Sequence, residues 1–598
     1  MASSPAAGDV PIAIQVFFAH WLVVALLLAV TPAQAASPPA DEAVHGMVVS
    51  AQRPAAEAGV EILKQGGNAI DAAVAVGYAE AVTNPCCGNI GGGGFLVARL
   101  ADGRDVFLNF RETAPGAATA GMYLDAEQKP IRGASLHGWK AVAVPGSVAG
   151  LDAALAKYGT LPRAAVMAPA IRLARDGFVL TRADADIIAR GAGILRRDKQ
   201  AARIFLRPDG TPPEPGERLI QPELAATLSD IAERGPEAFY EGSIPAAIEA
   251  ASRAGGGIIS AADMAAYRVT EAAPISCRYR GYVFLSAAPP SSGGTTLCEI
   301  LGVLEGYDLH EAGFASARTV HLMTEAMRHA FVDRTALGDP AFVSNPLEWL
   351  LSPEHARGIR AVIGDRATPS STLMPGAVMQ ERKETTHYSV IDGKGNAVAV
   401  TTTINGLFGA GVIAPGTGFL LNDEMDDFTI KPGSPNFFGL VQGTANAIAP
   451  GKRPLSSMAP TIVVRDGKVA MVLGSPGGSR IITIVLQVAL NMIDHGMAPR
   501  AAVDAPRVHH QWLPDEIMAE PFALSADTKA ALTVMGYRIV EQTPWGAAAL
   551  IAVGPAQPPE HDGVVSSGND STATRGPRPS VFYGANDPRR PAGAAVGY

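Results

Sequence analysis

Hydroxyl groups gather on one face of a β-hairpin predicted in the C-terminal half of the chain. Two runs rich in β-forming residues flank residues 393–395, which is typical of a hairpin with a three-residue loop. That register pairs Asp392 with Asn396 and therefore Thr385 with Thr403. Because side chains alternate between the faces of a strand, one face carries Thr385, His387, Ser389, Thr401, Thr403 and Asn405. By itself such a face is also typical of an ordinary solvent-exposed hairpin.

Further groups suited to acyl transfer follow downstream. Three carboxylates fall within four positions, at Glu424, Asp426 and Asp427. Gly477 and Gly478 precede an apolar helix predicted at 480–493, and N–H groups at a helix N-terminus can stabilise an oxyanion. The turn-dense segment 431–436 predicts a mobile lid. Each feature alone has a structural explanation, but together with Thr385 they indicate a nucleophilic active site.

A second polar pattern lies on the helix predicted at 317–335. His321, Glu325, His329 and Asp333 follow one another at intervals of four, which places them on one helix face. Such a stripe is compatible either with a metal site or with an ordinary polar helix face. No H-E-x-x-H motif occurs, and the two histidines are two turns apart, too far to share one ion. We expect a solvated or hydrogen-bonded face held by i,i+4 pairs of opposite charge, and no metal site.

The elements that must position these groups alternate along the chain without a long linker. Helices are predicted at 54–63, 70–82, 147–157, 163–175 and 223–231, and strands at 95–100 and 461–465. The glycines at 91–94 fit neither nucleotide-binding motif, so they predict a turn with close backbone approach. Segment 554–580, rich in Pro, Gly, Ser and Thr, is predicted to be a surface loop.

Composition limits the classes of function. Of 598 residues, 47% are hydrophobic and 18% charged, which excludes a largely disordered chain. The net charge of −9, without a Lys/Arg-rich run, argues against nucleic acid as the main partner. Four cysteines occur, at Cys86, Cys87, Cys277 and Cys298. Buried thiols are favoured over disulfides, although an oxidising compartment would permit the latter.

The N-terminus resembles an export signal. An apolar run at 21–30 is followed by A-Q-A, which predicts cleavage after Ala35 and a signal peptide at 1–35. No Lys or Arg occurs before Arg53, so the usual positive n-region is absent. The alternative is an uncleaved membrane anchor at 10–30. We expect export to the periplasm or the medium because the apolar run is short.

Several motifs, in one order along the chain, resemble the γ-glutamyltransferase (γ-glutamyl transpeptidase) family of N-terminal nucleophile hydrolases. Four lie downstream, TTHYSV at 385–390, NDEMDDF at 422–428, RPLSSM at 453–458 and GSPGGSR at 474–480. Five more lie at 66–69, 91–95, 110–115, 289–294 and 587–589. Together they are highly specific, and the resemblance covers nearly all of residues 46–598.

The resemblance implies an α/β protein with a four-layer αββα sandwich, made as a proenzyme without a cofactor. The family cuts itself before the motif threonine, here between Glu384 and Thr385. The products would be a large subunit, 36–384, and a small subunit, 385–598, which together form one heterodimer. The cut frees the Thr385 α-amine, and its reference pKa of roughly 7.7–8.0 suits a base near neutral pH.

The resemblance also implies substrate-binding and catalytic roles for individual residues of this chain. Arg111, Ser456 and Ser457 would bind the substrate α-carboxylate, a group that guanidinium geometry matches. The α-ammonium would be held by Asn405, Glu424 and Asp427. Gly477 and Gly478 would donate N–H groups to the oxyanion, and Thr403 would hydrogen-bond Thr385, in agreement with the hairpin register. Phe438 stands where lidded members have a tyrosine, which puts that lid contact in doubt.

The expected reaction is cleavage of a γ-glutamyl amide, as in glutathione, through an acyl-enzyme on Thr385. Water or an amino-acid or peptide acceptor would then remove the acyl group. A cephalosporin (glutaryl) acylase is the alternative, but a glutaryl group lacks the ammonium that Glu424 and Asp427 would bind. A non-catalytic periplasmic binding protein is the third class, and it predicts no self-cleavage.

Overall fold

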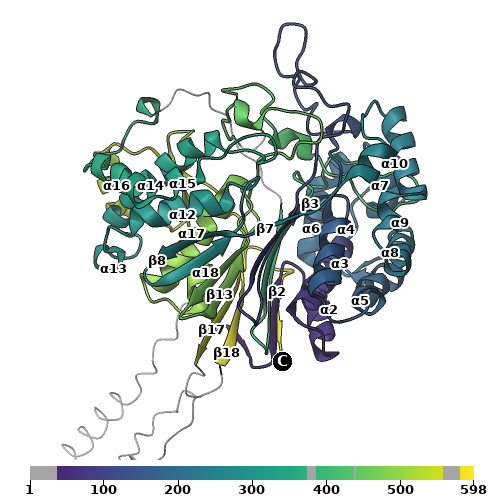
Figure 1. Cartoon of the computed structure of the whole chain (residues 1–598), viewed down its shortest axis with the longest axis horizontal. Coiled ribbons are helices and arrows are strands. Elements are labelled where there is room, and N and C mark those ends of the chain that lie inside the picture. Colours follow the sequence, from purple (N-terminus) through teal and green to yellow (C-terminus); the bar gives the residue numbers. More distant parts are fainter. Residues whose placement is uncertain (1–36, 374–384, 435, 437–438, 556–579) are drawn as a thin grey trace, which may run out of the picture. The chain divides into compact units, whose positions relative to one another are not determined.

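Two seven-stranded antiparallel sheets lie face to face at the centre of the fold (Figure 1). The structure is a computed structural model that describes residues 37–373, 385–434, 436, 439–555 and 580–598. The export signal predicted at 1–35, Glu384, Phe438 and the interior of the loop predicted at 554–580 lie outside these residues. All of the strands and helices among these described residues belong to the unit Ala40–Tyr598.

Each sheet combines strands from both halves of the chain. Sheet A has the order β1 (Asp41–Ala43), β18 (Ser580–Asn586), β17 (Ala549–Pro555), β13 (Lys468–Gly474), β12 (Thr461–Arg465), β9 (Tyr282–Ser286) and β8 (Ile275–Tyr279). Sheet B has the order β19 (Ala594–Gly597), β2 (Gly46–Ser50), β10 (Thr386–Asp392), β11 (Ala397–Thr403), β3 (Gly93–Arg99), β4 (Asp105–Phe110) and β7 (Thr270–Ala272). Two small sheets are formed by β14 (Val508–His509), β15 (Ile517–Ala519) and β16 (Ile539–Glu541), and by β5 (Phe178–Val179) and β6 (Arg218–Leu219).

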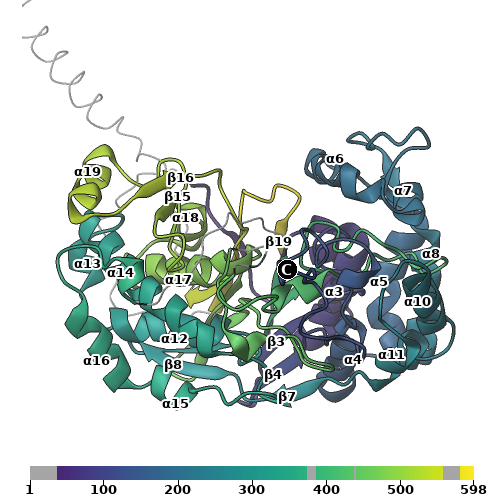
Figure 2. The ribbon, with the colours of Figure 1, turned by 90° about the horizontal axis from the view of Figure 1, so that it is seen from above.

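Helices cover the outer face of each sheet. Sheet B carries α2 (Arg53–Lys64), α3 (Ala69–Thr83) and α4 (Ser147–Tyr158), and α5 (Arg163–Asp176) packs on α3. Sheet A carries α12 (Gly293–Leu304), α17 (Ile481–Ile493) and α18 (Pro499–Asp504), and α14 (Ala317–Asp333) packs on α12. Figure 2 shows the two groups of helices on opposite sides of the sheets. The architecture is therefore the four-layer αββα sandwich expected from the sequence.

The remaining helices extend these two outer layers. On the sheet B side they are α6 (Arg182–Leu195), α7 (Lys199–Phe205), α8 (Pro222–Arg234), α9 (Glu237–Tyr240), α10 (Ser243–Ala254) and α11 (Ala261–Ala266). On the sheet A side they are α13 (Leu309–Ala312), α15 (Leu347–Leu350), α16 (Pro353–Val362) and α19 (Ala526–Met535). Among the residues described, none of the helices is both long enough and apolar enough to cross a bilayer.

Local sequence explains the buried helices nearest the sheets. Asn68 caps α3 by accepting from the backbone of Asp71, whose side chain accepts from the Asn68 N–H in return. Nearly every residue of α3 is buried, which fits a helix that is apolar on all sides. The predicted helices all form, with ends that differ by at most three residues. The helix predicted at 317–335 ends at Asp333, and a 3₁₀ turn, η2 (Arg334–Ala336), follows.

The β10–β11 hairpin has the predicted register, with Thr386 opposite Thr402 and Ile391 opposite Ala397. Asp392 fixes the turn because its carboxylate accepts from the backbone of Lys394 and Asn396. Both faces of the hairpin are buried, so the alternative of an exposed polar face is wrong. Its hydroxyl-rich face lies between the two sheets, against β13.

In the polar stripe on α14, His321 and Glu325 are buried, whereas His329 and Asp333 are half-buried. His321 bonds to the Tyr537 hydroxyl and the Gly364 carbonyl at 2.7 and 2.8 Å. Glu325 accepts from the same hydroxyl at 2.7 Å. The hydrogen-bonded face is confirmed, but the partners of His321, Glu325 and Asp333 lie on other elements and not at i,i+4 positions of the same helix. At the end of the stripe, Asp333 contacts His355 of α16 at 2.9 Å.

All four cysteines form disulfides, so the favoured prediction of buried thiols is wrong. The adjacent residues Cys86 and Cys87 are bonded to each other, and Cys277 is bonded to Cys298. The second bond joins β8 to its neighbour α12, and the two bonded cysteines are 21 residues apart in sequence. Sequence alone cannot specify such pairing because it depends on which side chains the fold brings together.

Candidate active site

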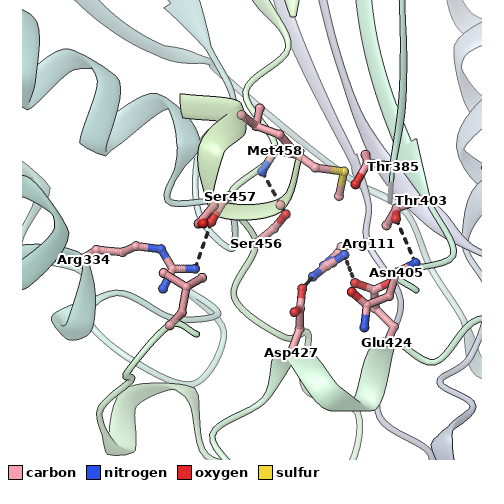
Figure 3. A pocket seen from close by; sticks show the side chains of 14 residues that line it. Arg111, Arg334, Thr385, Thr403, Asn405, Glu424, Asp427, Ser456, Ser457 and Met458 are labelled. Atoms are coloured by element: carbon pink, nitrogen blue, oxygen red, sulfur yellow. Dashed lines mark hydrogen bonds and ion pairs between the residues drawn. The ribbon is translucent and has the colours of Figure 1, made fainter. Parts of the chain in front are cut away.

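A cleft with about 320 Å³ of free space opens where several strands end. Thr385 immediately precedes β10, Thr403 ends β11 and Arg111 follows β4. The lining side chains are Arg111, Arg334, Thr385, Thr403, Asn405, Glu424, Asp427, Leu440, Ser456, Ser457, Met458, Gly478, Ser479 and Ile481 (Figure 3). The cleft therefore brings together nine of the ten catalytic and binding residues predicted from sequence, and the tenth, Gly477, adjoins it.

The open end of the hairpin forms one wall of the cleft. Thr385 is 4% exposed and Thr403 is 3% exposed. The hydroxyl of Thr403 accepts from the backbone N–H of Asn405 at 2.8 Å. Asn405 has a φ of 70°, a conformation that Asn tolerates better than most residues, and its amide donates to the carbonyl of Asp423 at 3.0 Å. These bonds hold Asn405 beside the two threonines.

A single 3₁₀ turn, η4 (Glu424–Asp427), presents the two predicted carboxylates to the cleft. On the turn, Met425 packs with Phe428 into a small apolar cluster, while Glu424 and Asp427 line the cleft. The Asn422 side chain anchors the turn by accepting from Glu424 N at 3.1 Å. The third predicted carboxylate, Asp426, accepts from the Ser135 hydroxyl and does not line the cleft.

Arg111 forms ion pairs with both cleft carboxylates, Glu424 and Asp427. Burial lowers the pKa of Arg111, but these two anions outweigh that effect and hold the pKa above its ordinary value. Burial raises the pKa of Glu424 well above its ordinary value, and Arg111 opposes the rise. A third carboxylate, Glu112, lies 3.7 Å from Arg111, and burial raises its pKa to about 7.

The serine loop at 453–458 is held by the predicted motif at 289–294. Ser291 donates its hydroxyl to the Met458 carbonyl at 2.6 Å. The backbone and hydroxyl of Ser292 both donate to the Ser456 carbonyl, at 2.8 and 2.7 Å. A side chain at Gly293 would meet the Met458 carbonyl at 2.2 Å, so this close approach requires glycine. The motif thus positions the two serine hydroxyls in the cleft.

Gly477 and Gly478 form the entry to α17, as predicted. Their φ angles are 141° and 58°, a region that favours glycine. A 3₁₀ turn, η6 (Gly478–Arg480), leads directly into the helix. The helix N-terminus therefore points toward the end of the hairpin that carries Thr385, where its dipole favours negative charge.

His387 is two residues from Thr385, but its environment makes it unsuited to act as a base. Its ring nitrogens contact Thr401 Oγ1 at 2.8 Å and Ser389 Oγ at 3.2 Å. Burial lowers the pKa of His387 to about 3, so the ring is neutral near pH 7. It is a structural part of the layer between the sheets.

Sequence reasoning missed five lining residues: Arg334, Leu440, Met458, Ser479 and Ile481. Met458 lies in the family motif at 453–458 and Ser479 in the family motif at 474–480, so these motifs could have indicated both residues. Arg334 follows the polar stripe by one residue and carried no distinguishing spacing. It is 2% exposed and donates to Ser457 in the cleft wall.

The model of the gamma-glutamyltranspeptidase family matches residues 55–596. The chain belongs to the gamma-glutamyltranspeptidase family. A glutathione hydrolase proenzyme of Pseudomonas sp. (strain A14) is 51% identical over 586 residues, covering 98% of this chain and all of that protein. A glutathione hydrolase proenzyme of Escherichia coli (strain K12) is 46% identical over 560 residues, covering 93% and 92%.

Solved structures resemble this gamma-glutamyltranspeptidase family member over the same core. Cephalosporin acylase from Bacillus halodurans superposes with a TM-score of 0.79 at 29% identity, covering 95% of this chain and 99% of that one. Helicobacter pylori gamma-glutamyltranspeptidase gives 0.53 at 41% identity, covering 54% and 93%. These likenesses support the N-terminal nucleophile hydrolase fold.

The cleft of this family member suits an α-amino acid headgroup. A guanidinium such as Arg111 matches a carboxylate through paired hydrogen bonds. Two carboxylates, Glu424 and Asp427, match an ammonium group. The hydroxyl of Thr385 lies in the same cleft, so a headgroup bound there would be close to a potential nucleophile. Family membership makes the chain an enzyme of the γ-glutamyltransferase and glutathione hydrolase class.

Proposed function

We propose that the chain is a self-processing γ-glutamyltransferase and glutathione hydrolase whose nucleophile is Thr385. Cleavage between Glu384 and Thr385 would give a large subunit, 36–384, and a small subunit, 385–598. The observation that carries this proposal is the shared cleft, in which Thr385 lies with Arg111 and the two acidic groups of η4. A threonine at the start of a buried strand also suits an N-terminal nucleophile, because the strand fixes its direction.

Cleavage supplies the base that the reaction needs. A threonine hydroxyl is a weak nucleophile until a base accepts its proton. The freed α-amine of Thr385, with a reference pKa of roughly 7.7–8.0, is in the same residue and deprotonates near neutral pH. The branched Cβ of Thr385 limits its hydroxyl to few rotamers. His387, the nearest other candidate, is excluded as base by its depressed pKa and its hydrogen bonds.

The catalytic cycle has two acyl transfers. Thr385 Oγ attacks the γ-carbonyl carbon while the α-amine takes the hydroxyl proton. The tetrahedral oxyanion accepts N–H bonds from Gly477 and Gly478, and Thr403 holds the Thr385 hydroxyl. Collapse breaks the amide bond, and the leaving nitrogen takes the proton. Water or the amine of an amino acid or peptide then attacks the γ-glutamyl ester and restores Thr385.

Substrate binding exchanges the ion pairs of the cleft. The substrate α-carboxylate would bind Arg111 and the hydroxyls of Ser456 and Ser457. The α-ammonium would bind Asn405, Glu424 and Asp427. Because Arg111 already pairs with both acids, a zwitterionic headgroup can replace each salt bridge by one of the same kind, without leaving a buried charge unpaired. Glutathione and other γ-glutamyl compounds carry this headgroup.

Glutaryl hydrolysis is the second candidate function because a solved cephalosporin acylase shares the fold. A glutaryl group has no ammonium, so it would leave Glu424 and Asp427 without a substrate cation. We expect γ-glutamyl p-nitroanilide to be hydrolysed and glutaryl p-nitroanilide to be a poor substrate. Preference for the glutaryl compound would instead favour the acylase.

Processing is tested on a denaturing gel with intact-mass analysis of the purified protein. We expect two fragments that meet between Glu384 and Thr385, and one uncut chain for Thr385→Ala. Thr533→Ala, at an exposed threonine of α19, is the matched control and should process normally. A wild-type chain that stays whole and inactive after long incubation would overturn the mechanism.

We also propose export to the periplasm or the medium, with removal of residues 1–35. The mature N-terminus, read by mass spectrometry after expression in a Gram-negative host, tests this. A chain that begins at Ala36 supports the proposal, and a retained apolar run at 21–30 in the membrane fraction contradicts it.

A further inference from the structure

Arg334 is a buried cation whose hydrogen-bond partners in the described structure are all uncharged. Its Nε donates to Ser292 Oγ at 2.9 Å, its Nη1 to Gln442 Oε1 at 3.4 Å and its Nη2 to Ser457 Oγ at 3.2 Å. Within the part of the chain that the structure describes, no carboxylate forms an ion pair with it. Arg111, in the same cleft, has two such partners at close range.

Because Arg334 has no ion-pair partner among the described residues, its buried positive charge is not compensated. Burial is the main effect that lowers the pKa of Arg334 to about 10, while the charge of Asp427 opposes this shift and the nearby charge of Arg111 contributes to it. The group is therefore still protonated at neutral pH, although a buried charge without an opposite charge is costly. Among the lining residues, two arginines face two acids, but both acids are engaged by Arg111. Of the two lining arginines, Arg334 is therefore the one whose positive charge is not neutralised by an ion pair with these acids.

The contacts of Arg334 also orient the two serines of the cleft. A serine hydroxyl has one proton to donate and can accept two bonds. Ser457 Oγ accepts from Arg334, and Ser456 Oγ accepts from the backbone N–H of Met458 at 3.1 Å. Ser292, the acceptor for Arg334 Nε, donates to the Ser456 carbonyl. The proton of Ser457 is thereby left for an acceptor in the cleft, and the loop carrying both serines is tied to the guanidinium.

We propose that Arg334 is a positioning residue for the substrate α-carboxylate, acting through Ser457 and supplying the unneutralised positive charge of that site. The proposal rests on the proposed function and adds a residue to it. Figure 3 shows Arg334 bonded to Ser457 on one side of the two serines, and Arg111 with Glu424 and Asp427 on the other side. A carboxylate between them would meet hydroxyl protons and two guanidinium charges, while Glu424 and Asp427 are released to the ammonium.

Three p-nitroanilides separate this role from a merely structural one. The γ-glutamyl compound carries both headgroup charges, the 4-aminobutanoyl compound lacks only the α-carboxylate, and the glutaryl compound lacks only the ammonium. Hydrogen bonds to charged groups contribute about 1.5–3 kcal/mol, which corresponds to roughly 10- to 100-fold in binding. For Arg334→Met we expect KM for the γ-glutamyl compound to rise by about that factor, with kcat changed less than about threefold.

The 4-aminobutanoyl compound is the critical comparison. Its kcat/KM should change less than about threefold in Arg334→Met, because it has no carboxylate for Arg334 to serve. Ser457→Ala should show the same substrate pattern, and adding Arg334→Met to it should cost less than the two separate effects combined. Arg334→Lys, which keeps the charge, should lose less than the Met variant. Arg360→Met, at an arginine that donates to the backbone carbonyl of Gly302, is the matched control.

The results distinguish a failure of the proposed role of Arg334 from a failure of the proposed enzymatic function. Equal loss on the γ-glutamyl and 4-aminobutanoyl compounds, or no loss on either, overturns the role of Arg334 while leaving γ-glutamyl transfer intact. Failure of the wild-type enzyme on the γ-glutamyl compound overturns the proposed function itself. If Arg334→Met does not process, Arg334→Lys and Ser457→Ala decide the question by the same comparison of substrates.

Discussion

The Nη1 of Arg111 and the carboxylate of Glu424 form an ion pair in which each side chain is 1% exposed. The pair joins the end of β4 to the turn η4, which are more than 300 residues apart in sequence. In the proposed reaction the substrate separates these two residues, taking Arg111 with its carboxylate and Glu424 with its ammonium. The ion pair thus holds the cleft in shape and selects a ligand that bears both charges.

Removing one member of this pair should destabilise the protein strongly. Arg111→Met leaves Glu424 and Asp427 buried without a cation, and breaking such a pair costs about 3–5 kcal/mol. Adding Glu424→Gln should restore part of that loss, because one unpaired charge disappears. Urea unfolding on the uncut Thr385→Ala background gives the free energies of a single chain. A double variant no more stable than Arg111→Met would contradict the coupling.

Thr403→Val should slow the reaction without unfolding the protein. The substitution keeps the shape of the side chain but removes the hydroxyl that accepts from Asn405 N and faces Thr385. We expect kcat/KM for γ-glutamyl p-nitroanilide to fall by roughly 10- to 100-fold. Thr401→Val, two residues away on the same face, removes a partner of His387 and should lower stability more than rate. Equal rate losses in both variants would argue against a specific role for Thr403.

Stability should fall as the pH is lowered through the range in which histidine normally titrates. Burial holds the pKa of His387 at about 3, below its ordinary value of 6.5, so the folded protein keeps this ring neutral. Below pH 6.5 the unfolded chain takes up the proton first, and the stability present above 6.5 is lost progressively toward pH 3. Between pH 6.5 and 5 the loss from this group is about 2 kcal/mol.

Urea unfolding at pH 7 and pH 5 measures this dependence. His387→Gln should unfold with a smaller difference between the two pH values than the wild-type chain. Other buried histidines with depressed pKa values, such as His509, keep part of the slope in the variant. An unchanged slope would show that His387 is protonated in the folded state or does not contribute.

The disulfide between Cys277 and Cys298 should add measurable stability. Its ends are 21 residues apart, and closing a loop of that length contributes about 3 kcal/mol in the chain-entropy description. Cys277→Ser/Cys298→Ser should therefore lower the Tm. The wild-type protein should show a similar loss after treatment with dithiothreitol under partly denaturing conditions. A reductant effect of the same size in the double variant would assign the loss to the Cys86–Cys87 bond instead.

Much of the fold near the site could be predicted because it depends on local pattern. The register of the β10–β11 hairpin follows from its turn, and it placed Thr403 opposite Thr385. The glycines at 91–94 were expected to permit close approach, and a side chain at Gly92 would meet the Thr403 carbonyl at 1.9 Å. Helices such as α3 and α17 were located by their apolar runs and glycine boundaries.

Burial and pairing could not be predicted in this way. The hydroxyl-rich face of the hairpin looked suited to solvent, but sheet A covers it. The four cysteines were predicted to be buried thiols, but the fold brings Cys277 to Cys298. Arg334 had no distinguishing spacing in the sequence. In the part of the chain that the structure describes, its hydrogen-bond partners are the uncharged side chains of Ser292, Gln442 and Ser457, which only the fold brings to it.

The sequence by itself determined the nucleophile candidate, its family and the types of charge in its site, because these depend on residue identity and short-range spacing. Only the tertiary structure decided that Arg111 is paired with both Glu424 and Asp427 while Arg334 is paired with neither of these two acids. Electrostatic energy depends on distance and burial, and residues remote in sequence acquire both only when the two sheets and their helices pack together.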